Sequence, residues 1–216
     1  IGEVGRKGSL GSYYSIRDYR AVDPELGTLA DFDAFVRRAH ALGMKVLIDW
    51  VANHTSRDAR WLAECPADWY ERDASGRPVV PNGWDDTAKL DYTNRAVWQG
   101  QIDAMRFWLA EHGVDGFRCD MAMLVPIEFW QEAARRLRAV KPDLFLLAEA
   151  EEDYLFRPGF RRVVCLAALS PDERRGAAEV PGRSYSGVSL CRSEARPGLG
   201  FAADVHFESR RELLER

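Results

Sequence analysis

Three short apolar runs, each followed by polar side chains, constrain the fold of this chain more than any other feature. Apolar residues recur with a helical period before and between them. The strand-like runs cover residues 44–51, 114–120 and 144–149, and the helix-like stretches cover residues 29–42, 95–112 and 126–140. Short apolar runs are typical of parallel strands buried on both faces. Alternation with helices predicts an α/β fold built from right-handed βαβ units.

The composition is that of a globular protein and excludes several function classes. The chain has 216 residues, 46% hydrophobic and 30% charged, with a net charge of −4, so no nucleic acid or anionic membrane is indicated as a partner. No run of eighteen apolar residues predicts a membrane span. The cysteines lack C-x-x-C spacing, which favours neither zinc nor secretion. The compartment stays open, and because the chain begins at Ile1 we expect it to start inside a gene product.

Two carboxylates end neighbouring strands of the predicted sheet. Asp120 and Glu149 are 29 positions apart, about one βαβ repeat, so we expect them at the same sheet edge. Carboxyl groups there can lie about 5 to 5.5 Å apart, as in retaining glycosidases. Arg118 points to the same side as Asp120 and is expected to keep it ionised. Any one such carboxylate could instead be a solvated loop residue or a helix cap.

Three motifs of the chain resemble signature regions of a known enzyme family. Asp49–His54 (DWVANH), Gly116–Asp120 (GFRCD) and Ala148–Glu149 resemble, in order and spacing, three of the four signatures of the α-amylase family of glycoside hydrolases. Residues 13–28 and 90–94 also look like that family, so the resemblance covers residues 1 to about 160. It implies part of a (β/α)₈ TIM barrel, roughly strands 3 to 5, with residues 56–94 inserted after strand 3.

The resemblance also implies a reaction and assigns roles to three residues. Asp120 corresponds to the nucleophile, Glu149 to the general acid and base, and Arg118 to the partner that keeps Asp120 charged. The implied activity is retaining hydrolysis of α-glucosidic bonds in malto-oligosaccharides or starch-like glucans. Hydrolysis and transfer share these signatures, so a glucosyl transferase or isomerase of the trehalose-forming type remains an alternative.

Further residues are assigned to binding by the same resemblance. His54 would bind the sugar being cleaved, and Tyr14, or its neighbour Tyr13, could stack on a sugar ring or belong to the core. Asn53 would supply a side-chain oxygen to a structural calcium ion that many relatives lack, and no cofactor is required. Asp49 is expected to be structural, with hydrogen bonds around the strand end.

Other conspicuous side chains favour structural interpretations. The insertion aromatics could be sugar platforms, but burial is the stronger expectation for most of them; they are Trp61, Trp69, Tyr70 and Trp84. Cys119 is expected to be a buried thiol, because nothing near it in the sequence would activate it. His40 and His112 are expected at the surface.

The fourth family signature, an Asn-His-Asp segment with a third catalytic carboxylate, is absent from the chain as written. All seven tryptophans precede residue 160, and residues 161–216 show no strand pattern. With suitable codons, residues 204–216 read one base later encode a string containing Asn-His-Asp. We therefore hypothesise a one-base shift near Phe160, which sequencing the DNA across that codon would test. Such a chain is expected to be inactive, and a degenerate sugar-binding remnant is the non-catalytic alternative.

Overall fold

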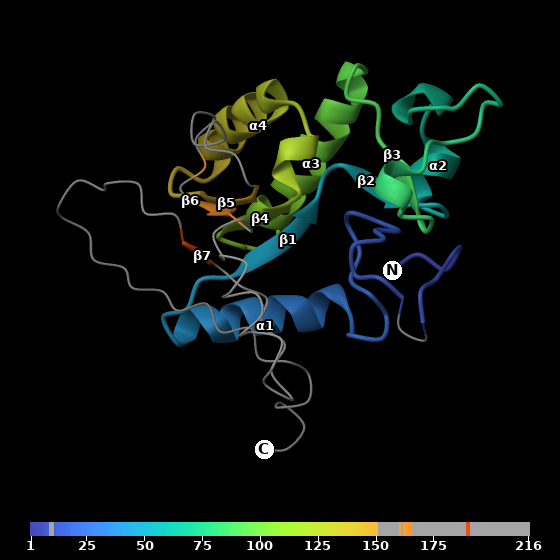
Figure 1. The fold of residues 1–216 in the computed structure, drawn as a ribbon. Coiled ribbons are helices and arrows are strands. Elements are labelled where there is room, and N and C mark those ends of the chain that lie inside the picture. The colour runs from blue at the N-terminus through green and yellow to red at the C-terminus, as the bar shows by residue number, and fades with distance from the viewer. Residues whose placement is uncertain (9–10, 151–159, 161, 166–188, 191–216) are drawn as a thin grey trace, which may run out of the picture.

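The chain alternates helices with parallel strands in the predicted order (Figure 1). The structure is a computed structural model and describes residues 1–8, 11–150, 160, 162–165 and 189–190. Its helices and strands are α1 (Leu29–Ala41), β1 (Leu47–Val51), β2 (His54–Ser56), α2 (Arg60–Glu64), β3 (Thr87–Lys89), α3 (Arg95–Ala110), β4 (Gly116–Asp120), α4 (Ile127–Val140), β5 (Phe145–Glu149), β6 (Arg162–Cys165) and β7 (Ser189–Leu190). Short 3₁₀ helices cover Ala67–Trp69, Pro81–Gly83 and Ala122–Leu124.

The main sheet is an arc of parallel strands in the order β1-β4-β5-β6, with β7 added antiparallel to β6. Leu47 pairs with Gly116, and Gly116 with Phe145, so the first residues of β1, β4 and β5 lie level. The carboxyl ends of these strands therefore meet at one edge. This arrangement is a partial (β/α)₈ barrel, as the sequence predicts.

Strand side chains alternate between a face covered by helices and a concave face. The covered face packs with α1, α3 and α4 into one hydrophobic core, and its fully or nearly buried strand residues are Trp50, Phe117, Cys119, Leu146 and Ala148. The concave face is more open, since Leu47 is 38% exposed and Arg118 and Leu147 are half-buried. The expected burial on both faces is therefore met on one only, because four parallel strands do not close around the other face.

Helix α1 begins and ends where the sequence signals predict. Thr28 and Asp31 form a capping box, in which the Thr28 hydroxyl accepts from the Asp31 N–H and the Asp31 carboxylate accepts from the Thr28 N–H. Gly43 follows the helix with φ of 76°. The strand begins at Leu47 rather than at residue 44. The Met44 N–H bonds to the Ala39 carbonyl and the Val46 N–H to the Asp115 carboxylate, so neither N–H bonds to a neighbouring strand's backbone.

The insertion at residues 56–94, predicted without regular structure, contributes β3 to a two-stranded antiparallel sheet whose other strand, β2, begins at His54, before the insertion. β2 pairs with β3, with Ser56 opposite Thr87. The insertion has its own small core, formed by Tyr70, Ala88, Leu90 and Val97. Long-range pairing of this kind leaves no local period in the sequence, which explains why the strands were not expected.

Residues 161–216, expected to contain no strand, contribute β6 and β7. β6 pairs in parallel with β5, placing Val164 opposite Glu149, and so covers an edge that β5 would otherwise expose. The other residues of this range lie outside the described residues. They include residues 204–216, on which the frame-shift hypothesis rests. None of the described helices is long and apolar enough to cross a membrane.

Candidate active site

One guanidinium group joins three carboxylates at the carboxyl end of the arc. Arg118 Nη1 donates to Asp49 Oδ1 at 2.8 Å and to Asp120 Oδ1 at 3.0 Å. Its Nη2 lies 2.8 Å from Glu149 Oε1. Asp120 and Glu149 are largely buried, with 9% and 14% of their side chains exposed. The structure thus brings the two predicted catalytic carboxylates and Arg118 together, and it adds Asp49.

Strand register explains why these side chains converge. Asp49 on β1 lies directly opposite Arg118 on β4, and Val51 lies opposite Asp120. Arg118 in turn pairs with Leu147 on β5, two residues before Glu149. Residues two apart on a strand share a face, so all four polar side chains project from the concave side near the strand ends.

The charge balance of this cluster differs from the sequence-based expectation. Arg118 was expected to hold Asp120 ionised, but burial, together with the charge of Glu149, raises the pKa of Asp120 to about 7 against the opposing effect of Arg118. One guanidinium is divided among three carboxylates, so Asp120 receives only part of its charge. Arg118 itself stays cationic: burial alone would lower its pKa, but the hydrogen bond and charge of Asp49 and the charge of Glu149 raise it.

Glu149 has a second hydrogen-bond donor that sequence reasoning missed. Its Oε2 accepts from the backbone N–H of Met121 at 3.1 Å. Met121 follows β4 in the left-handed conformation, with φ of 42° and ψ of 47°, which is uncommon for a residue with a side chain. This turn holds the N–H on Glu149. Nothing in the sequence signals it, because methionine is not typical of left-handed positions.

His54 is buried at the end of the DWVANH motif, and both of its ring nitrogens have partners. Nε2 lies 3.2 Å from the Tyr14 carbonyl oxygen, and Nδ1 lies 3.2 Å from Asn53 Nδ2. The ring also packs on Trp84, with centroids 5.1 Å apart. Burial lowers the pKa of His54 to about 4, so the ring is neutral at pH 7. A sugar hydroxyl could reach Nε2 only by displacing the Tyr14 carbonyl.

Two tyrosines hold the backbone of this motif in place. The Tyr19 hydroxyl donates to the Val51 carbonyl at 2.6 Å and lies 3.1 Å from the His54 carbonyl oxygen. The Tyr92 hydroxyl donates to the Ala52 carbonyl at 2.8 Å. These hydrogen bonds satisfy backbone carbonyls at the end of β1, where strand pairing stops. They therefore fix the positions of Asn53 and His54.

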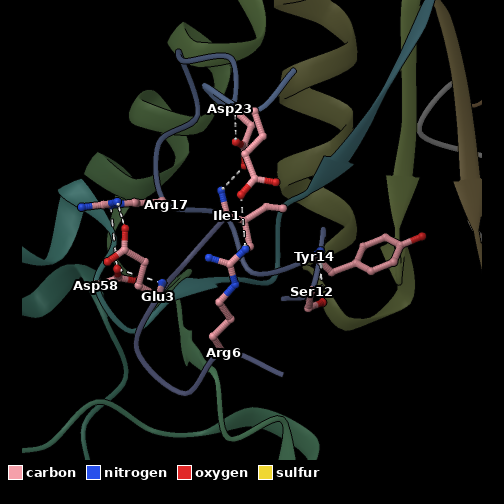
Figure 2. A network of polar contacts seen from close by, with 9 residues as sticks. Ile1, Glu3, Arg6, Ser12, Tyr14, Arg17, Asp23 and Asp58 are labelled. Carbon is pink, nitrogen blue, oxygen red and sulfur yellow. Dashed lines mark hydrogen bonds and ion pairs between the residues drawn. The ribbon is translucent and has the colours of Figure 1, made fainter. Parts of the chain in front are cut away.

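Tyr14 lies beside the charged cluster. Arg118 is positioned over its ring, 5.8 Å from the centroid, and the side chain is 42% exposed. Figure 2 shows the ring pointing away from the polar contacts of Glu3, Arg17 and Asp58. The open ring face suits stacking on a sugar, whereas Tyr13 is more exposed still, at 56%.

The residues around Asn53 do not provide the ligands that the predicted calcium ion needs. Asn53 lines a cavity with Glu71, Lys89 and Asp91, and the Lys89 ammonium pairs with Glu71 at 2.8 Å. Calcium takes six to eight oxygen ligands. Within the described ranges, no group of three or more His, Cys, Asp or Glu side chains could hold a metal. The donor set does not fit calcium.

The insertion aromatics mostly pack against one another. Trp61 and Trp69 meet edge-to-face with centroids 5.0 Å apart, and Tyr70 is 2% exposed. Cys119 is fully buried, and burial raises the pKa of its thiol well above the usual value, which agrees with an inert thiol.

The two histidines expected at the surface differ in their exposure to solvent. His40 is exposed. His112, in contrast, has 9% of its side chain exposed, and its Nδ1 lies 2.6 Å from Asp33 Oδ1. Its ring packs against Phe107 and Trp108, so the surface prediction for this residue is wrong. Tertiary packing between α1 and the end of α3 encloses it.

Comparisons with known proteins agree with this architecture. The family model "Alpha amylase, catalytic domain" matches residues 9–88. An α-amylase from Lactobacillus plantarum is 40% identical, with a TM-score of 0.75 over 84% of this chain and 50% of that one. The α-amylase MalA of Haloarcula japonica is 29% identical over 90% of this chain and 30% of its own length. An α-1,4-glucan:maltose-1-phosphate maltosyltransferase from Arcanobacterium haemolyticum is 34% identical over 66% of this chain and 22% of its own.

The fold and site define the class: a (β/α)₈-barrel chain with an acidic cluster at the carboxyl ends of its strands. Within that class, the chain belongs to the α-amylase family of glycoside hydrolases. It spans less than a third of the length of the curated relatives cited above and half of the L. plantarum structure.

Proposed function

We propose that this chain carries the nucleophile and the acid–base group of a retaining enzyme that acts on α-glucosidic bonds of malto-oligosaccharides or starch-like glucans. The observation that supports it is the convergence of Asp120 and Glu149 on Arg118 at the edge where barrel enzymes place their sites. The names of relatives in the family support glucans as the substrate class.

The proposed reaction has two displacements. An Asp120 oxygen attacks the anomeric carbon, the bond to the leaving oxygen breaks, and Glu149 gives its proton to that oxygen. Glu149 then takes a proton from water, the water oxygen attacks the anomeric carbon, and Asp120 leaves as a carboxylate. Two inversions at one carbon retain its configuration. Arg118 positions both carboxylates throughout, because it contacts each of them.

The resting cluster must rearrange before this reaction starts. The attack needs Asp120 ionised, whereas its pKa of about 7 leaves it partly protonated at neutral pH. Glu149 must carry a proton, but its Oε1 is ion-paired with Arg118 and its Oε2 accepts a hydrogen bond from the Met121 N–H. One of these contacts must give way when Glu149 becomes an acid. The substrate therefore has to bind in a way that redistributes one proton within the cluster.

Trapping the glycosyl intermediate tests this proposal directly. The full chain is incubated with α-glucosyl fluoride, whose leaving group needs little protonation, and its intact mass is measured. We expect a glucosyl adduct on Asp120. Asp120→Asn should give none, while Glu149→Gln should accumulate more adduct because water is no longer activated. Absence of adduct in the unchanged chain, or equal labelling of Asp120→Asn, would contradict the proposal and favour a non-catalytic remnant.

Transfer to a sugar acceptor is the second candidate activity, and the similarity to a maltosyltransferase favours testing it. The described residues contain the groups for the first displacement, which hydrolysis and transfer share. Incubation with maltotriose separates the two outcomes. Glucose and maltose alone indicate hydrolysis, whereas longer or newly linked oligosaccharides indicate transfer.

A further inference from the structure

A lysine ammonium lies in the cavity where Asn53 was expected to bind calcium. The cavity has a volume of about 250 Å³ and lies between the insertion and the segment after β4, with Leu124 and Pro126 on one side. Its charged lining residues are Glu71, Lys89 and Asp91. We propose that Lys89 is the resident cation of this cavity and takes the place of a divalent ion, so that the protein folds without calcium.

Backbone pairing fixes Lys89 in this position. Lys89 lies on β3 opposite His54, so its strand is anchored to the end of the DWVANH motif. Its N–H donates to the Val79 carbonyl at 2.9 Å, and its carbonyl accepts from the Glu71 N–H at 3.1 Å. The side chains of Lys89 and Glu71 therefore emerge from adjacent segments. Their charged ends meet, with Nζ 2.8 Å from Oε1.

Two further oxygens at the cavity already accept hydrogen bonds. Asp91 Oδ1 accepts from the Thr93 N–H at 2.8 Å and from the Thr93 hydroxyl at 2.6 Å, in a turn that precedes α3. The Asn53 carbonyl oxygen accepts from the Leu90 N–H at 3.1 Å. Hard cations need several free oxygens at about 2.3 to 2.6 Å. Here one oxygen of Glu71 pairs with Lys89, and one oxygen of Asp91 accepts from Thr93, which leaves fewer carboxylate oxygens for an ion.

Charge complementarity favours the ammonium over an added divalent ion. Glu71 and Asp91 line the cavity together with Lys89, and the ammonium pairs with Glu71. A divalent ion placed among them would lie close to Lys89, and like charges at short range repel strongly where water is partly excluded. The lysine supplies the positive charge through a covalent link to β3. A chelator would therefore find no bound metal ion to remove from this cavity.

Calcium binding and thermal unfolding of the full chain test the proposal without any activity measurement. Equilibrium dialysis with CaCl₂ should show no saturable binding below about 1 mM, which is the range of weak protein sites. The midpoint of thermal unfolding should be the same in CaCl₂ and in EDTA. One tightly bound calcium ion per chain, with a midpoint that rises on calcium addition, would overturn the proposal. Neither result depends on the proposed function.

Substitution of the lysine sharpens the test. In Lys89→Met, Glu71 loses its cation, so we expect a lower unfolding midpoint than in the unchanged chain. Lys7→Met is the matched control, because Lys7 pairs with Asp85 and Asp86 outside the cavity, and its midpoint should not respond to calcium. An unchanged midpoint in Lys89→Met would refute the proposal.

A charge-preserving variant covers the case in which Lys89→Met does not fold. Lys89→Arg keeps the positive charge in the cavity, so it should unfold at about the midpoint of the unchanged chain and remain indifferent to calcium. A calcium-dependent Lys89→Arg would show that charge at this position does not substitute for the ion, and would also overturn the proposal.

Discussion

At the scale of single residues, the candidate site depends on how one positive charge is shared. Arg118 contacts Asp49, Asp120 and Glu149, so each carboxylate raises the cost of ionising the others. Sequence spacing predicts that Arg118 lies beside Asp120. It does not predict the raised pKa of Asp120, because that depends on burial and on Asp49, which comes from a strand almost seventy residues earlier.

Asp49 should therefore control the pH at which Asp120 reacts. In the unchanged chain, adduct formation from α-glucosyl fluoride should increase with pH around a midpoint near 7, because only ionised Asp120 attacks. Asp49→Asn removes a charge that raises the pKa of Asp120 and releases Arg118 Nη1. We expect the midpoint to fall by roughly one pH unit, measured as the initial rate of labelling against pH.

A surface acid serves as the control for this experiment. Glu64→Gln removes an exposed carboxylate that pairs with Arg60 and should leave the midpoint unchanged. If Asp49→Asn leaves the midpoint at the same pH or raises it, the charge-sharing explanation is wrong.

At the scale of helices and strands, Asp115 connects elements at the opposite end of the sheet from the site. Its largely buried carboxylate accepts from the Val46 N–H at 2.9 Å and pairs with Lys45 at 3.1 Å. It also contacts His40 at 2.7 Å and Lys141 at 3.3 Å. One side chain thus links α1, the start of β1, β4 and the end of α4. This arrangement places a stabilising network at the opposite end of the barrel from the candidate site.

Asp115→Asn should destabilise the protein in a pH-dependent way. Burial raises the pKa of Asp115, but hydrogen bonds from Val46, His40 and the lysines outweigh it and lower the pKa to about 2. A carboxyl with a lowered pKa stabilises the fold above its unfolded pKa and loses that effect as the pH falls through the folded value. We expect a loss of about 2 kcal/mol at pH 7 in urea unfolding, which shrinks towards pH 2.

The neighbouring acid Asp143 provides a matched control for that substitution. Asp143 pairs with the same Lys141 at 3.7 Å but is 66% exposed, so Asp143→Asn should change the free energy of unfolding little. Equal losses in the two variants, or a loss in Asp115→Asn that is independent of pH, would argue against the buried network.

At the scale of the whole molecule, the described sheet is an open arc. Among the described residues, β1 pairs with β4 on one side and has no strand on the other. Large apolar side chains near this edge and on α1 are exposed, namely Phe35 at 59%, Leu42 at 57%, Met44 at 52% and Leu47 at 38%. Unpaired edges with apolar side chains are templates for association.

We expect the chain to self-associate through this edge. Light scattering should show a mass that rises with protein concentration, and Leu47→Lys should reduce the rise because a charge on an edge strand opposes strand pairing. Leu26→Lys is the control, since Leu26 is 66% exposed but lies in the loop before α1. A monomer at all concentrations, or an equal effect of both substitutions, would exclude association through β1.

The sequence by itself determines the alternation of helices and strands, the capping of α1, the placement of Asp120 and Glu149 at one sheet edge, and the family. The helices and strands follow from local periodicity, and the shared edge of Asp120 and Glu149 follows from the spacing of the βαβ repeat. The family follows from the resemblance of the motifs at residues 49–54, 116–120 and 148–149. Tertiary structure alone decided the features that join distant segments: the sharing of Arg118 with Asp49, the left-handed Met121 that holds Glu149, the enclosure of His112, and the ammonium of Lys89 beside Asn53. Each depends on burial, charge and register between elements that lie far apart in the chain. Contacts between such distant elements leave no local pattern in the sequence.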